Sequence, residues 1–431
     1  MTTHHRFLVG DALAVLRTLP DASVHCIVTS PPYWGLRDYG VPGQIGLEPT
    51  PWEYVEKLVS VFREARRVLR PDGVLWLNLG DSYATFAGRV GEHPGGGERG
   101  ARWHGPTTQP NRLPQRGLKP KDLVGIPWLV AFALRDDGWY LRRDIVWAKG
   151  VSGVLRAGNP MPESVRDRPA SAHEYVFLFS KSEDYYYDAD AVAESPLTGD
   201  TRPPLGAASV KLRNGLVVPN PHSGARRLKV PSGWDVSKGS HGSIHRLGRS
   251  AGTVYMMSET SRSRLRDVWL IFPDPFPGAH FATFPESLAA LCILAGTSEF
   301  GCCSACGAPY ERVVERKKAR VEGRRSKVGD SGTVRRRDLP ERPGGFVGAS
   351  AVTSGWRSTC DYNAEVMPCT VLDPFGGSGT VSLVARRLGR NSIYVDLNPD
   401  YARMAVDRCG PWNQPYLDGS VDTYDLVEVG A

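Results

Sequence analysis

The sequence lacks the features that mark membrane and secreted proteins. No uninterrupted apolar run approaches the roughly 18 residues that a membrane span needs. The first seven residues, MTTHHRF, lack the apolar core of a secretory signal peptide. Eight cysteines in 431 residues do not suggest a disulfide scaffold. We therefore expect a cytoplasmic protein with no membrane partner.

The chain also has little excess of either charge overall. Lys and Arg number 53 against 46 Asp and Glu, which gives a formal net charge of +7. A balance of this size permits a polyanionic partner without requiring one. The local balance differs, because residues 201–266 hold 12 Lys and Arg but only 2 Asp and Glu. This pattern favours a nucleic-acid contact module, with a solvated insertion as the alternative.

Regular structure is indicated by apolar runs that alternate with amphipathic segments. Strands are predicted at residues 24–28, 74–81, 140–147, 173–180 and 268–271, and helices at residues 12–19, 52–69, 121–137 and 287–295. Strands that alternate with helices are typical of an α/β domain with a largely parallel sheet. The length of the chain is sufficient for a large core and for more than one domain.

The C-terminal part contains a strand, a glycine-rich turn, a helix and a second strand. The turn is Asp373 to Gly379, with the sequence DPFGGSG, and the second strand ends at Asp396. This order is the βαβ unit of nucleotide-binding folds, in which an acid after the second strand binds ribose hydroxyls. The turn lacks the G-x-G-x-x-G pattern, however, and begins with an acid that would repel a pyrophosphate. It suits a cationic ligand such as the sulfonium of S-adenosylmethionine.

A second polar loop follows the predicted strand at residues 24–28. It reads Thr29-Ser30-Pro31-Pro32-Tyr33-Trp34. Prolines stiffen the backbone and leave its carbonyls free, while the aromatic rings offer flat faces. A stiff loop of this kind can hold a planar ring that carries an amino group. The alternative from these residues alone is a proline-rich turn closed by core aromatics.

These two loops together resemble the amino-group DNA methyltransferases, which methylate N4 of cytosine or N6 of adenine. Residues 373–379 resemble the cofactor motif of that family, and residues 29–33 resemble its catalytic Ser-Pro-Pro-Tyr motif. The catalytic motif precedes the cofactor motif, which is the order of the β class. Residues 281–288, 142–149 and 174–181 resemble further family motifs. The resemblance covers residues 1–187 and 268–410.

The resemblance implies a class I S-adenosylmethionine-dependent methyltransferase fold, an α/β fold with a seven-stranded, mostly parallel sheet, helices on both faces, and insertions. It implies base contacts from Ser30, Pro31, Pro32 and Tyr33. It implies S-adenosyl-L-methionine contacts from Asp11, Phe281, Thr283, Asp373, Pro374, Phe375, Gly376, Gly377, Ser378, Gly379 and Asp396. Capping of the helix at residues 12–19 by Asp11 is compatible with such a contact.

The predicted domain layout follows from the same resemblance and from composition. Residues 1–187 form the catalytic half of the methyltransferase domain, and residues 268–300 and 361–431 form the cofactor-binding half. Residues 188–267 occupy the place of a target-recognition insertion. Residues 301–360 form a second insertion, which is basic and contains cysteines.

The expected function is site-specific methylation of double-stranded DNA, by direct transfer to the exocyclic amine of a flipped base. Ser30, where relatives can have Asp, favours N4 of cytosine, and N6 of adenine is the alternative. Attack by Cys369 on a cytosine ring is rejected, because Pro368-Cys369 precedes the cofactor strand. An RNA methyltransferase and an inactive nucleic-acid-binding protein are less favoured. The sequence contains no evident endonuclease motif, so any restriction endonuclease partner would be a separate chain.

Five of the eight cysteines lie at or between residues 302 and 369. Cys303 and Cys306 have the spacing of a zinc knuckle, and Cys360 is a plausible third ligand. A complete structural site has four ligands, and Cys302, Cys369 or Asp361 could supply the fourth. Structural zinc and free buried thiols both remain open from the sequence.

Overall fold

The computed structural model describes residues 1–84, 117–152, 157–158, 165–194, 209–211, 217–219, 264–272, 285–317, 320–321, 346–347, 350–412 and 421–429. The chain divides into two compact units. The first comprises Met1–Val192, Leu265–Arg312 and Trp356–Ala431, and the second comprises Ala193–Arg264 and Val313–Gly355. In the described part of the chain, no helix is long and apolar enough to cross a membrane.

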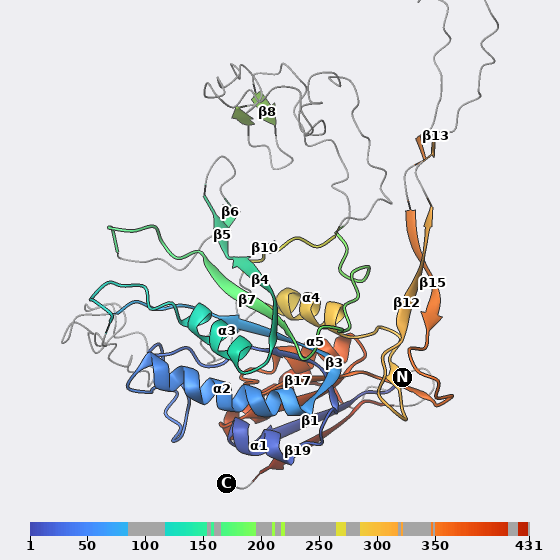
Figure 1. Cartoon of the computed structure of the whole chain (residues 1–431), viewed down its shortest axis with the longest axis horizontal. Helices are drawn as coiled ribbons and strands as arrows, with labels where there is room; N and C mark the ends of the chain where they lie inside the picture. The colour runs from blue at the N-terminus through green and yellow to red at the C-terminus, as the bar shows by residue number, and fades with distance from the viewer. Residues whose placement is uncertain are drawn as a thin grey trace, which may run out of the picture. The chain divides into compact units, whose positions relative to one another are not determined.

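The first unit is built on one large sheet (Figure 1). Its strands lie in the order β10-β4-β7-β3-β2-β17-β18-β1-β19. They are β1 (His4–Val9), β2 (Val24–Thr29), β3 (Leu69–Leu79), β4 (Tyr140–Ala148), β7 (His173–Ser180), β10 (Val268–Leu270), β17 (Thr370–Asp373), β18 (Asn391–Asp396) and β19 (Thr423–Glu428). Among the described strands of this sheet, only β7 runs antiparallel to its neighbours, β3 and β4. The predicted α/β class and mostly parallel sheet are therefore confirmed.

The predicted number of strands was wrong, because within the described residues the sheet has nine strands rather than seven. The two additional strands lie at its edges. β10 pairs with β4, and β19 pairs with β1 in a register from His4–Thr423 to Val9–Glu428. β19 was not predicted at all, since its residues are exposed and carry no apolar run. Both additions extend the sheet without changing the seven strands between them.

In the part of the chain that the structure describes, six helices cover the two faces of the sheet: α1 (Ala12–Thr18), α2 (Pro51–Val68), α3 (Ile126–Asp136), α4 (Glu286–Gly296), α5 (Thr380–Arg387) and α6 (Pro399–Cys409). The core on one face joins the sheet to α1, α2 and α3 and includes Leu16, Phe62 and Leu134. Two further core clusters join the sheet to α4, α5 and α6 and include Ile293 and Ala405. The layers are visible in Figure 1, where α2 and α3 lie in front of the strands.

Local sequence explains where the helices begin. Thr50 caps α2 by accepting a hydrogen bond from the Glu53 N–H at 3.2 Å, and Pro51 occupies the first turn. Helix α3 begins at Ile126 and not at the predicted residue 121. The reason is Gly125, which is left-handed with φ of 82° and donates its N–H to Asp81 at 3.0 Å. Asp81, at the end of β3, therefore fixes the start of α3.

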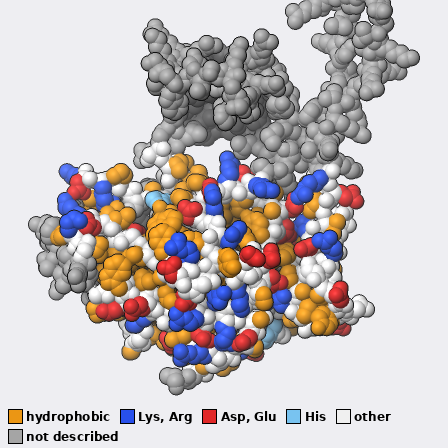
Figure 2. Space-filling view, in the orientation of Figure 1, with side chains coloured by type: hydrophobic (Ala, Val, Ile, Leu, Met, Phe, Trp, Pro, Cys, Tyr) orange, Lys and Arg blue, Asp and Glu red, His pale blue; other side chains and the backbone are white. Residues whose placement is uncertain are grey.

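Short strands form separate two-stranded pairs outside the large sheet. They are β5 (Gly150–Val151) with β6 (Ala157–Gly158), β8 (Ser209–Lys211) with β9 (Val217–Pro219), β11 (Cys302–Cys303) with β16 (Val366–Met367), β12 (Glu311–Lys317) with β15 (Ser350–Arg357), and β13 (Arg320–Val321) with β14 (Phe346–Val347). On the face shown in Figure 2, Lys and Arg side chains are interspersed with Asp and Glu.

Candidate active site

The predicted loops meet at one edge of the large sheet. Strands β2, β3, β17 and β18 are parallel, so their carboxyl ends lie at the same edge. β7 runs the opposite way and brings its first residues to that edge. In open α/β sheets, ligands bind outside the carboxyl ends of the strands. The site therefore lies where sheet topology predicts it.

One hydrogen bond joins the two loops directly. The Thr29 hydroxyl, at the end of β2, donates to Asp373 Oδ1 at 2.7 Å, although the two residues are 344 positions apart. Both side chains are buried, with 1% and 2% of their surfaces exposed. The loop that begins at Ser30 and the loop that begins at Asp373 are thus held side by side. Sequence alone predicted both loops but not this contact.

Two acids, Asp373 and Asp396, are buried in the loop region. Burial raises the pKa of Asp373 to about 7. Hydrogen bonds from the Thr29 hydroxyl and the Phe375 N–H lower this pKa, but by less than burial raises it. Burial likewise raises the pKa of Asp396 to about 6. Neither carboxyl forms an ion pair with a described residue. The ionised form of a buried carboxyl without an ion pair is stabilised most by a ligand that brings a positive charge or donates hydrogen bonds from hydroxyls.

The glycine-rich turn is shaped by close packing. A Cβ on Gly376 would lie 2.2 Å from the Tyr394 ring, and one on Gly379 would lie 2.6 Å from the Cβ of Ala405. Gly379 has φ of 76° and precedes α5. The Gly377 N–H donates to Asp396 Oδ2 at 2.8 Å. The turn therefore lies against β18 and α6, with Asp396 beside its backbone.

Ser30 belongs to a hydrogen-bonded network of four side chains. Its hydroxyl donates to Asn78 Oδ1 at 3.1 Å. The Tyr33 hydroxyl lies 2.7 Å from Glu174 Oε2 and 3.1 Å from Asn78 Oδ1. Burial is the largest cause that raises the pKa of Tyr33 well above its usual value, and the charge of Glu174 adds to it. Tyr33 is therefore a neutral phenol that can donate one hydrogen bond.

Asn78, Glu174 and Lys149 were not predicted as site residues. The Asn78 amide donates to Glu174 Oε2 at 3.2 Å and to the Tyr175 carbonyl at 3.1 Å. Lys149 forms an ion pair with the other oxygen of Glu174, and its ammonium lies 4.6 Å from the centre of the Trp147 ring. The signal in the sequence was a polar residue at the end of an otherwise apolar strand. Asn78 near the end of β3 and Glu174 near the start of β7 both fit it.

The remaining predicted base contacts lie in the same loop. The Pro32 carbonyl accepts a hydrogen bond from the Tyr54 hydroxyl at 2.8 Å, and Pro31 is buried. Trp34, which the sequence offered as a second flat face, is only 3% exposed and donates to the Glu48 carbonyl at 2.9 Å. Of the two alternatives that the sequence left open, a core aromatic therefore describes Trp34, because its indole belongs to the core.

The other residues that were predicted to contact the cofactor differ in their burial and hydrogen-bond partners. Asp11 lies just beyond β1 and accepts a hydrogen bond from the Ala14 N–H at 2.9 Å, so it caps α1 as expected. Pro374 is buried, and the Phe375 ring packs on Phe62. The Ser378 hydroxyl accepts a hydrogen bond from Arg408 at 2.9 Å. Phe281 and Thr283 lie outside the described residues.

The strand order and the paired loops define the class of the protein. A mostly parallel sheet with a single reversed strand, helices on both faces and an acid-rich site at the carboxyl ends is the S-adenosylmethionine-dependent methyltransferase fold. A family model described as DNA methylase matches residues 24–303 and 369–407. The chain belongs to this family of amino-group DNA methyltransferases, and it is an S-adenosylmethionine-dependent enzyme that acts on DNA.

Two similar curated proteins span most of the chain. The type II methyltransferase M.Cfr9I of Citrobacter freundii is 36% identical over 404 residues, which cover 93% of this chain and 85% of that protein. The type II methyltransferase M.SmaI of Serratia marcescens is 34% identical over 404 residues, which cover 94% of this chain and 90% of that protein. A putative DNA modification methylase of Thermus thermophilus, solved with S-adenosyl-L-methionine, is 18% identical with a TM-score of 0.44 and 99% of both chains covered.

Proposed function

We propose that this enzyme methylates N4 of cytosine within a specific site of double-stranded DNA. The single observation that carries the proposal is the Thr29–Asp373 hydrogen bond, because it joins the loop of Ser30 to the loop of Asp373. A methyl donor at one loop and an acceptor amine at the other would then be in contact. Holding two reactants in line supplies much of the acceleration of such a transfer.

The donor side of the site consists of Asp373, Asp396 and the glycine-rich turn. S-adenosylmethionine, when bound, supplies a methyl group attached to a positively charged sulfur. Asp373, with its raised pKa, would stabilise that charge and would ionise in doing so. Asp396 would accept hydrogen bonds from the ribose hydroxyls, and Asp11 at the end of the neighbouring β1 would receive the adenine amine. Residues 374–379 would surround the methionine and sugar.

The acceptor side consists of Ser30 and the network behind it. The amine of a base is a poor nucleophile, since its lone pair is delocalised into the ring. Because Ser30 directs its own proton to Asn78, its two oxygen lone pairs face away from that bond. They and the Pro31 carbonyl would accept the two amine N–H groups and make the nitrogen more pyramidal. Tyr33, fixed by Glu174, would stack on the base with Pro32 beside it.

The preference for cytosine rests on Ser30. Cytosine and adenine both present a ring acceptor beside the amine, so a hydroxyl can serve either base. A serine in this position is the form that favours N4 of cytosine in the family, and N6 of adenine is the second candidate. A base inside a duplex cannot reach a pocket at the end of a sheet, so the proposal includes base flipping.

Recognition of the DNA is assigned to residues 188–267. Their charge is the support, with 12 Lys and Arg against 2 Asp and Glu in residues 201–266. Most of this segment lies outside the described residues. Because the similar proteins are named type II methyltransferases, a separate restriction endonuclease would be the natural partner of this enzyme.

A cysteine-based route to C5 of cytosine has no support. Cys369 has none of its surface exposed and directly precedes β17. It therefore lies at the amino end of the strand that carries Asp373 at its carboxyl end. A nucleophile must reach the base, and Ser30 and Tyr33 would have no role in that route.

A transfer assay with labelled S-adenosylmethionine tests the proposal. The enzyme should label duplex DNA that contains its site and should leave RNA of the same sequence unlabelled. Label in RNA alone would identify an RNA methyltransferase. Normal cofactor binding with no transfer to either substrate, over a library of DNA sequences, would identify an inactive nucleic-acid-binding protein.

A further inference from the structure

The Cys303-to-Cys306 segment forms a tight turn that aims two thiols the same way. The Gly307 N–H donates to the Cys303 carbonyl at 2.7 Å, and the Cys303 N–H donates to the Ala308 carbonyl at 2.9 Å. Gly307 has φ of 72°, in the left-handed region that favours glycine. The spacing predicted a knuckle, and the backbone forms one.

A third thiol returns to this turn from far along the chain. Cys360 follows Cys306 by 54 positions, yet the sulfur atoms of Cys303, Cys306 and Cys360 all lie within 4.8 Å of one another. Thr359 donates to the Pro309 carbonyl at 2.7 Å, and Arg357 forms an ion pair with Glu311. Thiolates bound at about 2.3 Å to a tetrahedral ion lie about 3.8 Å apart, so only a small contraction is needed.

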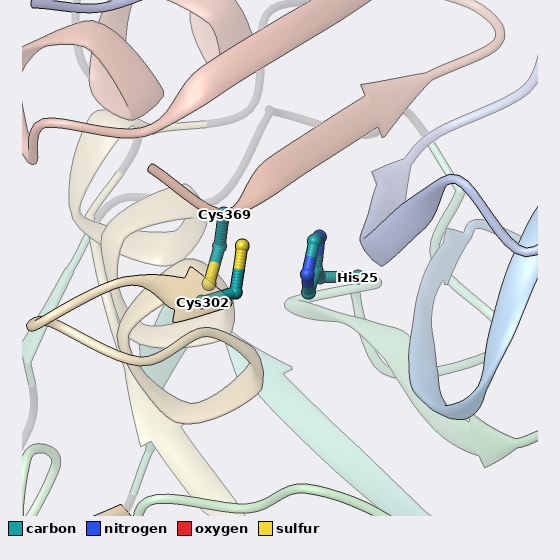
Figure 3. Close-up of side chains that lie close together, drawn as sticks. All are labelled: His25, Cys302 and Cys369. Carbon is teal, nitrogen blue, oxygen red and sulfur yellow. The ribbon is translucent and has the colours of Figure 1, made fainter. Parts of the chain in front are cut away.

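A second cluster of side chains that can bind metals lies beside the first, but these side chains already have hydrogen-bond partners. His25, Cys302 and Cys369 also converge, as Figure 3 shows. His25 has no free lone pair, however, because Nδ1 accepts from the Thr370 N–H at 3.0 Å and Nε2 donates to the Gly307 carbonyl at 2.9 Å. Cys302 points to the opposite side of β11 from Cys303 and donates to the Met367 carbonyl at 3.5 Å. This group is a packed part of the core.

We propose that Cys303, Cys306 and Cys360 bind one structural zinc ion. Thiolate sets select zinc over magnesium or calcium. Within the described residues, no fourth His, Cys, Asp or Glu joins the three sulfurs. The Arg70 guanidinium donates to the Cys306 carbonyl at 2.6 Å, and its positive charge suits a centre with three thiolates.

The position of the site indicates a structural role. Gly307 contacts His25 near the start of β2, whereas Ser30 follows the end of β2. Five strand residues at roughly 3.3 Å each separate these points by about 16 Å. The ion would therefore join the two ends of the insertion that follows Cys306, where they leave the first unit. It would take no part in methyl transfer.

Metal analysis of the full-length protein, purified without chelators, tests the proposal. About one zinc per chain is expected, and C303S, C306S and C360S should each lose most of it. C302A and C369A are the matched controls, because both remove a neighbouring thiol, and both should keep their zinc. No zinc in the wild-type protein, even after incubation with zinc salt, would overturn the proposal. So would loss of zinc from C369A with retention in C360S.

Cobalt substitution of the wild-type protein gives a second test that does not depend on the folding of a variant. Three thiolates around Co²⁺ should give strong thiolate-to-cobalt charge-transfer absorption and the intense visible bands of tetrahedral cobalt. Added zinc should abolish both. Cobalt that binds without charge-transfer absorption, or that does not bind, would contradict the three-thiolate site.

Discussion

At the scale of single residues, the proposed transfer depends most on the Ser30 hydroxyl. S30A removes the oxygen that is proposed to accept the amine hydrogens but leaves Asp373 and the glycine-rich turn intact. We expect kcat to fall about 100-fold, as when one preorganised hydrogen-bonding group is lost. Affinity for S-adenosylmethionine should stay within about twofold. S60A is the control, since Ser60 lies on α2, away from the proposed site, and donates to the Glu56 carbonyl of its own helix. Equal loss of turnover and cofactor affinity would contradict this role.

Glu174 is proposed to act through Tyr33, and a double-mutant cycle can separate this from a general loss of structure. E174A removes the carboxylate that accepts the phenol proton, and Y33F removes the phenol hydroxyl. Because the two changes break one hydrogen bond, the double variant should lose no more kcat than the worse single variant. We expect either change alone to lower kcat about tenfold, with the Michaelis constant for S-adenosylmethionine little altered. Additive losses would show that Glu174 does not act through Tyr33.

The raised pKa of Asp373 predicts how cofactor binding depends on pH. Below its pKa of about 7 the buried acid is protonated and cannot pair with a cation. Affinity for S-adenosylmethionine should therefore rise with pH, by up to about tenfold per unit, and should level off above pH 7. Calorimetric titration from pH 5.5 to 8 measures this. D373N should bind weakly with a much flatter profile, whereas an unchanged slope in D373N would assign the dependence to another group.

The same shift has a consequence for the stability of the ligand-free protein. The folded pKa of Asp373 lies above its ordinary value of 3.8, so the folded state holds this proton more tightly than the unfolded state. This contribution to the free energy of unfolding is complete below pH 3.8 and is lost as the pH rises through about 7. Asp396 adds a contribution of the same sign, which is lost through about pH 6.

At the scale of elements, the glycine-rich turn must lie against β18. In G376A the new methyl group would meet the buried Tyr394 ring at 2.2 Å, so the turn has to move. We expect a loss of about 1–3 kcal/mol in the free energy of unfolding, measured by denaturant titration, and at least about tenfold weaker cofactor binding. G355A is the control, because a Cβ there has nothing within 4 Å. Wild-type affinity in G376A would contradict the proposed donor site.

The sequence predicted the elements of the site better than its contacts. Strand ends are visible as apolar runs followed by Gly, Pro or Asp, so the loops at Ser30 and Asp373 could be located. The Thr29–Asp373 bond could not be predicted from spacing, since it depends on β2 lying next to β17. Glu174 reaches Tyr33 only because β7 runs antiparallel beside β3, and antiparallel register is not encoded in local periodicity.

Two local features that the sequence did not settle have simple physical causes. For Trp34 the sequence left a flat face of the site and a core aromatic open. The turn carries the indole inward to the core, where its N–H donates to the Glu48 carbonyl. The start of α3 was predicted too early, because the helical pattern of residues 121–125 does not reveal that Asp81 will accept hydrogen bonds from Gly125 and Ile126. In both cases a distant partner decided the outcome.

At the scale of the whole molecule, the predicted layout is a catalytic unit interrupted by two basic segments. The predicted boundaries at residues 188, 267, 301 and 360 remain predictions. The site and the large sheet belong to the first unit, whereas Ala193–Arg264 and Val313–Gly355 belong to the second. We therefore expect chemistry and site recognition to be carried by different segments. Substitutions among the Lys and Arg of residues 201–266 should alter DNA affinity and its salt dependence more than cofactor binding.

The central claim is direct transfer of a methyl group to the exocyclic amine of cytosine in DNA. Mass spectrometry of nucleosides from DNA of cells that express the protein, combined with sequencing of the modified positions, tests it most directly. The account predicts N4-methylcytosine at one recurrent sequence, absent from cells that express S30A. N6-methyladenine in its place would contradict the choice of base, and 5-methylcytosine would contradict the mechanism.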